Sequence, residues 1–419
     1  MTRIPSLIIL CVLTALAARG ADPTHTSYTR AQCQGSAMPY PAPEQIAEYP
    51  DSLTPVMINH VGRHGARFPA SANHANTIGK ALKEATAQGT ITPLGKRLLA
   101  LTDRVTALSA NRWGALDSLG MAEQRGIASR MYAAYPMLFD SSSVTAISSY
   151  SPRCIMSMYE FTHQLARLNN HQDIYTASGR AFSPLLRFFD LNDEFRELIK
   201  SPEISDKVEQ YASQTLTYKP LDRVLGEKFR YDDETDRYRI AMAEYSFLAG
   251  LSAMGLDIDT TPYLTTDEYN ALWRVFNLRQ YLMRTASTVS PLPAQISSPL
   301  LSDIISSFDE FLAGKNPAKV NLRFAHAETL MPLLSLMRLQ GCYYLTNYFD
   351  TVGLHWKDFH VVPMAANLQL ILFQAPSGTY YLRADLNEHP VPLIPNDSSV
   401  YTEWSRAREY LQRCLPLVY

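Results

Sequence analysis

The feature that most constrains this chain of 419 residues is the heptapeptide RHGARFP at residues 63–69, which follows an apolar run directly. That run, PVMI at residues 55–58, predicts a buried strand that ends near His60. Strands of an open α/β sheet carry their ligand-binding loops at their carboxyl ends. The heptapeptide therefore predicts a site at the edge of such a sheet.

The residue types in the heptapeptide favour a phosphate site with a nucleophile in it. Arg63 and Arg67 are permanently charged, and each offers a planar fork of donors that fits phosphate oxygens. His64 between them is a neutral nitrogen nucleophile that can carry a phosphoryl group transiently. Gly65 removes a side chain where the backbone approaches the anion.

Two later strands repeat this arrangement of a strand followed by a charged loop. Residues 143–149 alternate β-branched and small side chains, and Arg153 follows them. Residues 319–324 predict another strand, followed by His326, Glu328 and a helix with Pro332 in its first turn, stopping at Gly341. A helix N-terminus favours anions, so His326 can donate to a phosphate oxygen there. Glu328 can protonate a departing alkoxide if its pKa is raised enough.

These motifs resemble those of the histidine acid phosphatases. The heptapeptide matches the Arg-His-Gly-x-Arg-x-Pro signature of that family, and His-Ala-Glu at residues 326–328 is similar to the branch called multiple inositol polyphosphate phosphatases. The family commonly has His-Asp at this place. In this chain one more residue separates the histidine from the carboxylate, and the glutamate side chain is longer than that of aspartate, so the proton donor is displaced. The resemblance extends in order over most of the chain after the leader.

The resemblance implies a two-step hydrolysis of phosphate esters. His64 would attack phosphorus, Glu328 would give a proton to the leaving alcohol, and water would then hydrolyse the phosphohistidine. Arg63, Arg67, Arg153 and His326 would bind the phosphate and its transition-state charge. In the family an arginine at the place of Arg153 supplies a third fork. No metal and no cofactor are expected, because the arginines would take over the role that magnesium has in other phosphoryl-transfer sites.

The predicted fold class is α/β, a histidine-phosphatase-like sheet flanked by helices with an inserted, mostly α-helical domain. We expect the α/β catalytic domain to comprise residues 22–158 and 308–419, and the inserted helical domain to comprise residues 159–307. The inserted range contains a capping box at residues 265–268 and then apolar residues at helical spacing. Further helices are expected at 78–88, 94–108 and 121–135. Residues 361–362 and 368–373 are expected to form a strand pair or one bent strand. Residues 380–385 are expected to form the next strand, in an antiparallel hairpin with 368–373.

The first 20 residues are typical of a secretory signal peptide, with Arg3 before an apolar core and small residues after it. The alternatives, an uncleaved anchor or a lipid-modified cysteine, fit less well, because the apolar run is short and the residues before Cys11 are bulky. A secreted or periplasmic location follows. Cys33, Cys154, Cys342 and Cys414 remain without a predicted pairing, and their spacing fits no zinc site.

The leading function is an exported phosphomonoesterase acting on inositol polyphosphates such as inositol hexakisphosphate (phytate) through a phosphohistidine. The alternatives are a broad acid phosphatase or glucose-1-phosphatase-like enzyme and, from another class, a phospho-ligand binding protein without turnover. A net charge of −2 gives no basic field for nucleic acid. We also expect no membrane partner, and we expect the protein to be a monomer. Candidates for binding further phosphates are Lys80, Arg187 and Arg323, while His60 and His74 are interpreted as structural.

Overall fold

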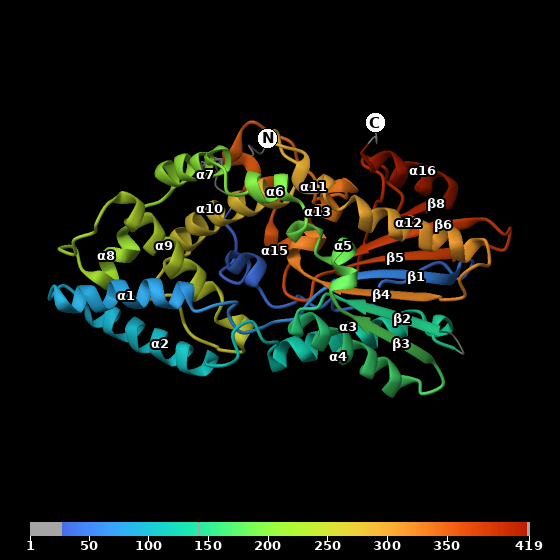
Figure 1. Ribbon diagram of the computed structural model, residues 1–419, viewed down its shortest axis with the longest axis horizontal. Helices are drawn as coiled ribbons and strands as arrows, with labels where there is room; N and C mark the ends of the chain where they lie inside the picture. Colours follow the sequence, from blue (N-terminus) through green and yellow to red (C-terminus); the bar gives the residue numbers. More distant parts are fainter. Residues whose placement is uncertain (1–26, 141–142, 417–419) are drawn as a thin grey trace, which may run out of the picture.

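The computed structural model describes residues 27–140 and 143–416 (Figure 1). The predicted signal peptide, residues 1–20, lies outside the described residues. A mixed sheet, eight-stranded over the described residues, occupies one half of the molecule. Its order is β3-β2-β4-β1-β5-β6-β7, with β8 paired to β6. The strands are β1 (Thr54–Arg63), β2 (Ser143–Ser148), β3 (Asp173–Ser178), β4 (Val320–Ala325), β5 (Asn367–Gln374), β6 (Tyr380–Leu386), β7 (His389–Val391) and β8 (Tyr401–Glu403).

The parallel part of the sheet brings three strand ends to one edge. β1, β4 and β2 are neighbours, and their register aligns Arg63 with Ala325 and Ser148 with Phe324. On the other side of β1, β5 and β6 run antiparallel, which confirms the predicted hairpin. β1 extends to Arg63, beyond the predicted end near His60, because its polar residues stay paired to β4 and β5 inside the sheet.

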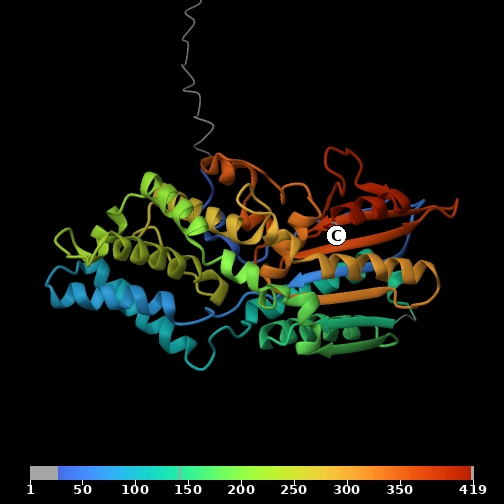
Figure 2. The same ribbon diagram turned by 45° about the horizontal axis from the view of Figure 1, so that its top comes forward.

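Both faces of the sheet are covered by helices, which confirms the predicted fold class. α3 (Ser118–Ala134) and α4 (Pro152–Leu168) share a core with Ile58, Val144 and Leu322 on one face. α12 (Ser298–Leu312), α13 (Ala327–Leu336) and α16 (Trp404–Cys414) share a core with Met57 and Val61 on the other. Alternate residues of β1 therefore point to opposite cores, as strand geometry requires. The layers are visible in Figure 2.

A helical lobe lies beside the sheet (Figure 1). It packs α1 (Asn73–Ala87) and α2 (Pro93–Ser109) against α8 (Lys219–Leu225), α9 (Glu234–Ala249) and α10 (Thr266–Arg284) around one apolar core. The predicted capping box at the start of α10 is confirmed, with Thr265 and Glu268 reciprocally hydrogen-bonded. The other helices are η2 (Gln32–Ala37), η3 (Pro136–Leu138), η4 (Arg180–Phe182), α5 (Ser183–Leu186), η5 (Phe188–Asp190), α6 (Asp193–Leu198), α7 (Pro202–Thr215), η6 (Ser252–Met254), α11 (Leu292–Gln295), η7 (Phe349–Thr351), α14 (Val352–His355) and α15 (Asp358–Val361).

The division into 22–158 with 308–419 and an insertion at 159–307 stays a prediction. Two features of the packing bear on where its limits fall. β3 lies within the range 159–307 but pairs with β2 of the sheet. α1 and α2 lie within 22–158 but share the core of the helical lobe.

Three local predictions are wrong. Val361 ends the helical turn α15 and does not start a strand, because two buried apolar residues before Pro363 carry no periodicity that separates strand from helix. Pro332 lies in the middle of α13, beyond its first turn. That helix ends at Leu336, so Gly341, in a left-handed conformation with φ of 77°, belongs to the following loop. Within the described residues, no helix has the length and apolar character to cross a membrane.

Candidate active site

The predicted site residues come together at the edge where β1, β4 and β2 end. The backbone N–H of His64 donates to the carbonyl oxygen of Ala325 at 3.0 Å, directly before His326. The rings of His64 and His326 lie 5.8 Å apart between centroids. Arg153 lies in the first turn of α4, after β2, and it approaches His326 with Nη2 at 3.4 Å from Nδ1. The sheet thus places three loops, distant in sequence, at one point.

His64 is held as a neutral ring with one nitrogen available. Its Nδ1 lies 2.9 Å from the carbonyl oxygen of Gly65, so Nδ1 carries the proton and Nε2 keeps its lone pair. Burial, reinforced by Arg63, Arg67 and Arg153, lowers the pKa of His64 well below its usual value. The side chain is therefore uncharged at physiological pH, as a nitrogen nucleophile must be.

The arginines around His64 form a positively charged cluster that could bind an anion. Arg63 Nη1 donates to the carbonyl oxygens of Ser36 and Val362, each at 2.6 Å, which fixes its guanidinium. The Nε atoms of Arg63, Arg67 and Arg153 are buried without a protein partner. Burial lowers the pKa of Arg63 to about 10, and burial together with Arg153 and Arg63 lowers that of Arg67 to about 9. Since uncompensated buried cations are costly, this cluster favours a bound phosphate.

The loop at residues 63–69 is held by α3. Glu123 accepts from the backbone N–H of Ala66 at 2.7 Å and from that of Tyr40 at 2.8 Å. Gln124 donates to the carbonyl oxygen of Arg63 at 2.9 Å. The loop and the helix approach so closely that a Cβ on Gly120 would lie 2.1 Å from the carbonyl oxygen of Ala66. Sequence reasoning missed the role of Glu123, since a glutamate inside a helix carries no local signal.

His326 caps α13 and is surrounded by donors. Its Nε2 lies 2.9 Å from Ser149 Oγ and 2.8 Å from Arg187 Nη1. Burial lowers the pKa of His326, and Arg153 and Arg187 lower it further against the opposing effect of Glu328. The ring is therefore neutral and has a single N–H to offer. Arg187, a candidate for binding a further phosphate, instead contacts this ring directly.

Glu328 lies two residues further on, at the start of α13, with 38% of its side chain exposed. Its Oε1 is 3.9 Å from Arg284 Nη2. Burial alone would raise its pKa, but Arg284, His326, its own backbone N–H and Arg63 outweigh that effect and hold the pKa below its usual range. Glu328 is thus ionised while the cluster holds no anion. A bound phosphate would oppose the surrounding positive charge and so would raise this pKa.

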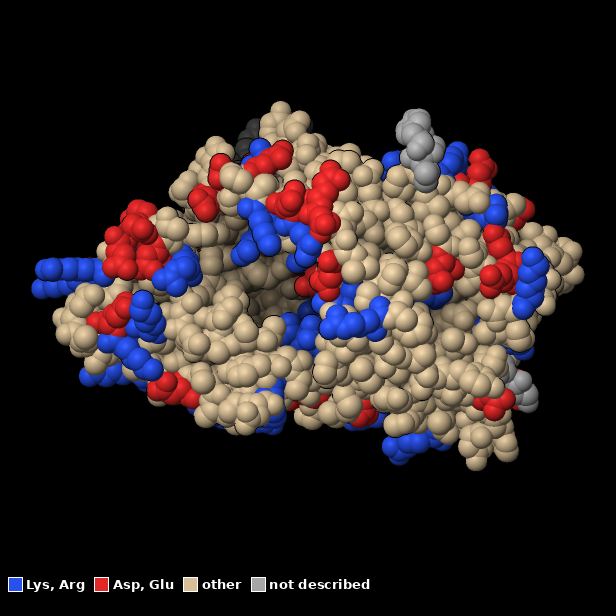
Figure 3. Space-filling model, in the orientation of Figure 1, with Lys and Arg blue, Asp and Glu red and all other residues tan. Residues whose placement is uncertain are grey.

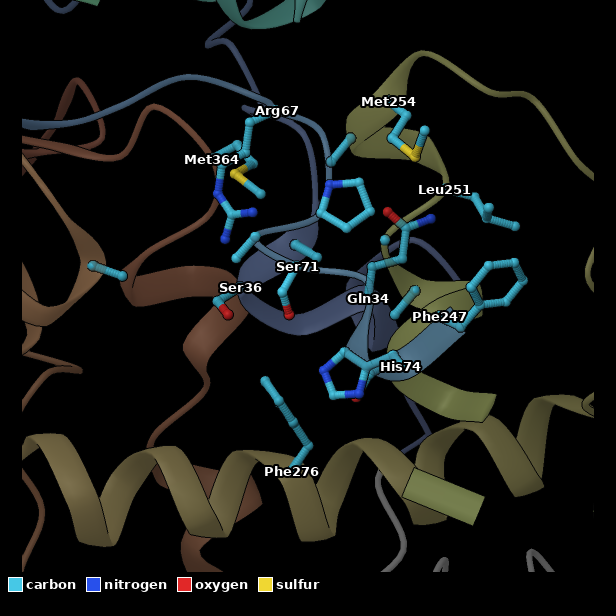
Figure 4. A pocket seen from close by; sticks show the side chains of 18 of the residues that line it. Gln34, Ser36, Arg67, Ser71, His74, Phe247, Leu251, Met254, Phe276 and Met364 are labelled. Carbon is cyan, nitrogen blue, oxygen red and sulfur yellow. The ribbon is translucent and has the colours of Figure 1, made fainter. Parts of the chain in front are cut away.

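These groups open into a cavity of about 320 Å³ between the sheet edge and the helical lobe, seen as a hollow in Figure 3. Arg63, His64, Arg67, Arg153 and Glu328 line its inner end. The lobe contributes an apolar wall from α9, η6, α10 and the residues between them, and Figure 4 shows side chains of this wall directed into the space. The labelled members of the wall are Phe247, Leu251, Met254 and Phe276.

Neutral polar residues complete the lining of this cavity. Gln34 and Ser36 come from the N-terminal arm, Ser71 comes from the loop before α1, and His74 comes from the first turn of α1 (Figure 4). His74, interpreted from the sequence as structural, therefore faces the cavity. His60 is packed between the rings of Phe161 and Phe324, in agreement with a structural role.

Two other basic candidates lie away from the cavity. Lys80 is exposed on α1 and pairs with Glu84 at 3.5 Å. Arg323 is buried in β4, where it pairs with Asp303 at 2.6 Å and donates to Asn59 at 2.8 Å. The four cysteines of the described residues are free thiols. Among those residues, no three His, Cys, Asp or Glu side chains gather as a metal site would require.

A neutral histidine among arginines, faced by a His-x-Glu pair at a helix N-terminus, defines a phosphatase built on a mixed α/β sheet. Residues 56–387 match the Histidine phosphatase superfamily (branch 2), so the chain belongs to that family. The predicted family assignment and the prediction of a phosphatase are confirmed.

Named relatives refine the comparison. The chain is 24% identical over 400 residues to multiple inositol polyphosphate phosphatase 1 of Homo sapiens, covering 87% of this chain and 80% of that protein. It is 24% identical over 399 residues to the protein of the same name from Gallus gallus, with 87% and 84% covered.

Solved structures share the fold. The multiple inositol polyphosphate phosphatase of Bifidobacterium longum, in complex with inositol hexasulfate, superimposes with a TM-score of 0.79 at 18% identity, over 91% of this chain and 97% of that one. The phytase from D. castellii gives a TM-score of 0.70 at 16% identity, over 96% and 89% of the two chains.

Proposed function

We propose that this protein is an exported phosphomonoesterase that hydrolyses inositol polyphosphates, phytate among them, through a phosphohistidine on His64. The observation that carries the proposal is the neutral His64, with Nε2 free, at the centre of Arg63, Arg67 and Arg153. The substrate class is supported by the names of the relatives and by the inositol hexasulfate bound in the similar bacterial structure. The predicted leader sequence supports export to a secreted or periplasmic location.

In the first step, Nε2 of His64 attacks phosphorus and the bond from phosphorus to the ester oxygen breaks. The arginines and the N–H of His326 bind the other phosphoryl oxygens, and their preorganised donors stabilise the charge that develops there. Glu328 gives its proton to the leaving alkoxide. The bound phosphate makes this possible, because its negative charge opposes the arginines that keep the carboxylate ionised in the free site.

In the second step, water attacks phosphorus and the bond from phosphorus to Nε2 breaks. Glu328, now a carboxylate, accepts the proton of the attacking water, which restores the protonated carboxyl that was present in the substrate complex. Inorganic phosphate then leaves the arginine cluster. Glu328 takes up a proton from solvent when the substrate binds and loses it again when phosphate leaves. The proposed reaction requires neither a metal nor a cofactor. The protein is proposed to work as a monomer.

The walls of the cavity also favour a second candidate, a broad acid phosphatase or glucose-1-phosphatase-like enzyme. Among the described residues that line the cavity, the arginines are the three at its inner end, and the lobe contributes apolar and neutral polar side chains. Such a wall fits the alcohol of many monoesters. A phospho-ligand binding protein without turnover fits less well, since His64, Glu328 and the arginines that the proposed reaction needs line the same cavity.

The direct experiment is release of phosphate from phytate by the purified protein, with the inositol phosphate products separated by isomer. Stepwise appearance of lower inositol phosphates is the expected result. Activity on glucose 1-phosphate and p-nitrophenyl phosphate without activity on phytate would favour the second candidate. Binding of phytate with no phosphate released from any ester would leave only the binding protein.

The salt dependence of substrate affinity also distinguishes an inositol polyphosphate phosphatase from a broad acid phosphatase. A highly phosphorylated ring held by several cations should lose affinity with salt more steeply than a monophosphate does. The slope is measured from KM for phytate and for p-nitrophenyl phosphate between low and physiological ionic strength. Equal slopes would indicate that one phosphate supplies all of the electrostatic binding, in agreement with the broad phosphatase.

A further inference from the structure

Arg187 lies outside the three sequence motifs of the site. The segment that precedes it is hydrogen-bonded to the start of α13, the helix that His326 caps. It follows α5 directly, and the carbonyl oxygen of Leu186 accepts a hydrogen bond from Thr329 Oγ1 at 2.8 Å. The same hydroxyl accepts from the backbone N–H of His326 at 3.4 Å. One threonine in the first turn of α13 therefore ties the segment before Arg187 to the start of the helix.

The side chain of Arg187 is fixed on several sides. Its Nε donates to Asp190 Oδ2 at 2.6 Å, and 17% of the side chain is exposed. Its guanidinium carbon lies over the rings of Tyr150 at 4.8 Å and Phe189 at 5.1 Å. Phe189 in turn packs edge-on against the ring of His326, with centroids 5.9 Å apart. These contacts leave Nη1 at 2.8 Å from Nε2 of His326.

An arginine can only donate hydrogen bonds, so this contact requires Nε2 of His326 to be an acceptor. A neutral imidazole has one acceptor and one N–H, which places the proton on Nδ1. The hydroxyl of Ser149, 2.9 Å from Nε2, can donate to the same lone pair. Nδ1 has looser neighbours, Arg153 Nη2 at 3.4 Å and Cys154 Sγ at 3.8 Å.

We propose that Arg187 is a positioning residue that fixes the tautomer of His326, so that Nδ1–H donates to an oxygen of the phosphoryl group beside Arg153. The inference rests on the proposed phosphatase chemistry. It differs from a direct role for Arg187 in substrate binding, in which the guanidinium contacts a second phosphate of the substrate. The two roles separate on a substrate that has one phosphate, because only the positioning role then affects turnover.

The variant is Arg187→Met, which keeps an unbranched apolar stem and removes the donors. The matched control is Arg180→Met. Arg180 stacks on the same Tyr150 ring at 4.5 Å, and within the described residues no hydrogen bond joins it to His326. Each variant is assayed with p-nitrophenyl phosphate for kcat and KM, and with inorganic phosphate as a competitive inhibitor. Thermal unfolding checks that each variant is folded.

With p-nitrophenyl phosphate, Arg187→Met should lower kcat/KM about tenfold to a hundredfold, the loss expected for one charge-assisted hydrogen bond in the site. Arg180→Met should stay within about twofold of wild type, as expected of an exposed charge. Arg187→Lys, which retains a donor and the charge, should fall between them and serves as the test if the methionine variant does not fold. Unchanged kinetics on the monophosphate, with loss confined to phytate, would overturn the positioning role.

The tautomer itself can be measured. In protein labelled with ¹⁵N-histidine, the Nε2 signal of His326, assigned by its loss in His326→Gln, should have the shift of an unprotonated nitrogen in wild type. In Arg187→Met it should move toward the average of the two tautomers, and in Arg180→Met it should not move. A protonated Nε2 in wild type would contradict the inference. Wild type without any turnover of p-nitrophenyl phosphate would instead contradict the proposed function and leave this measurement standing.

Discussion

The Nδ1 atom of His64 lies 2.9 Å from the carbonyl oxygen of Gly65, the residue that follows it in the chain. A local contact of this kind selects the tautomer of the ring and leaves the lone pair of Nε2 free, as the proposed nucleophile requires. The backbone that supplies the carbonyl is itself fixed, since Gly65 N–H donates to Ser157 Oγ at 3.1 Å. The reactivity of the histidine therefore depends on the conformation of its loop.

Glu328→Gln should slow phytate hydrolysis far more than hydrolysis of p-nitrophenyl phosphate. An inositol alkoxide needs a proton to leave, whereas a nitrophenolate can leave unaided. Loss of the general acid should lower kcat for phytate roughly a hundredfold to ten-thousandfold. Steady-state rates on both substrates, with a search for a nitrophenol burst, provide the measurement. Equal slowing of both without a burst would mean that Glu328 only orients the site.

The pH dependence of kcat should change with the same variant. A general acid must be protonated, so kcat for phytate should fall as pH rises through the pKa of Glu328 in the substrate complex. We expect that pKa to be higher than in the free site, where Arg284 and His326 keep it low, because the bound phosphate opposes their charge. The descending limb should disappear in Glu328→Gln. A limb that persists unchanged would have to be assigned to another group.

Gly120→Ala should damage the site, because its Cβ would lie 2.1 Å from the carbonyl oxygen of Ala66 and push the signature loop away from α3. We expect at least a tenfold loss of kcat/KM, since displacement of reacting groups by about 1 Å costs on the order of a hundredfold. Gly79→Ala in α1 is the matched control. Its nearest neighbour would be Thr102 Oγ1 at 3.5 Å, an ordinary contact, so activity should be unchanged. Full activity in Gly120→Ala would show that the close approach is not required.

The sequence alone predicted the charged residues that line the inner end of the cavity, because each follows a strand that its own composition reveals. It could not predict the contacts of Glu123 with the loop at residues 63–69, the contact of Arg187 with His326, or that His74 faces the cavity. These side chains act through the packing of segments that are distant in the chain, and a single glutamate or arginine in a helix or loop has the same local pattern wherever it points. Lys80 and Arg323 failed as candidates for the same reason, since basic character does not tell which core or surface a side chain meets.

Stability should depend on pH through Glu244, a residue of α9 with no exposed surface and no partner for either carboxylate oxygen among the described residues. Burial raises its pKa from 4.5 to about 8, with Glu268 adding to the shift and Arg223 opposing it. Because the folded pKa is the higher one, this group stabilises the fold fully below pH 4.5, and the contribution is lost as pH rises toward about 8.

Glu244→Gln removes this titration and keeps the shape of the side chain. The variant should unfold at nearly the wild-type temperature near pH 4 and at a progressively higher temperature than wild type as pH approaches 8. The difference in the free energy of unfolding there should be on the order of a few kcal/mol. Thermal unfolding of both proteins across this pH range is the measurement. If the unfolding temperatures of the two proteins differ by the same amount at every pH, Glu244 is solvated or paired.

The most direct test of the account is to trap the phosphoryl group on His64. Wild-type protein mixed with ³²P-labelled phytate and quenched within milliseconds in base should retain label that is stable in base, labile in acid and located on Nε2 of His64. His64→Ala, checked for folding by thermal unfolding, should retain no label and release no phosphate. Label on another residue, or substantial turnover by His64→Ala, would contradict the account.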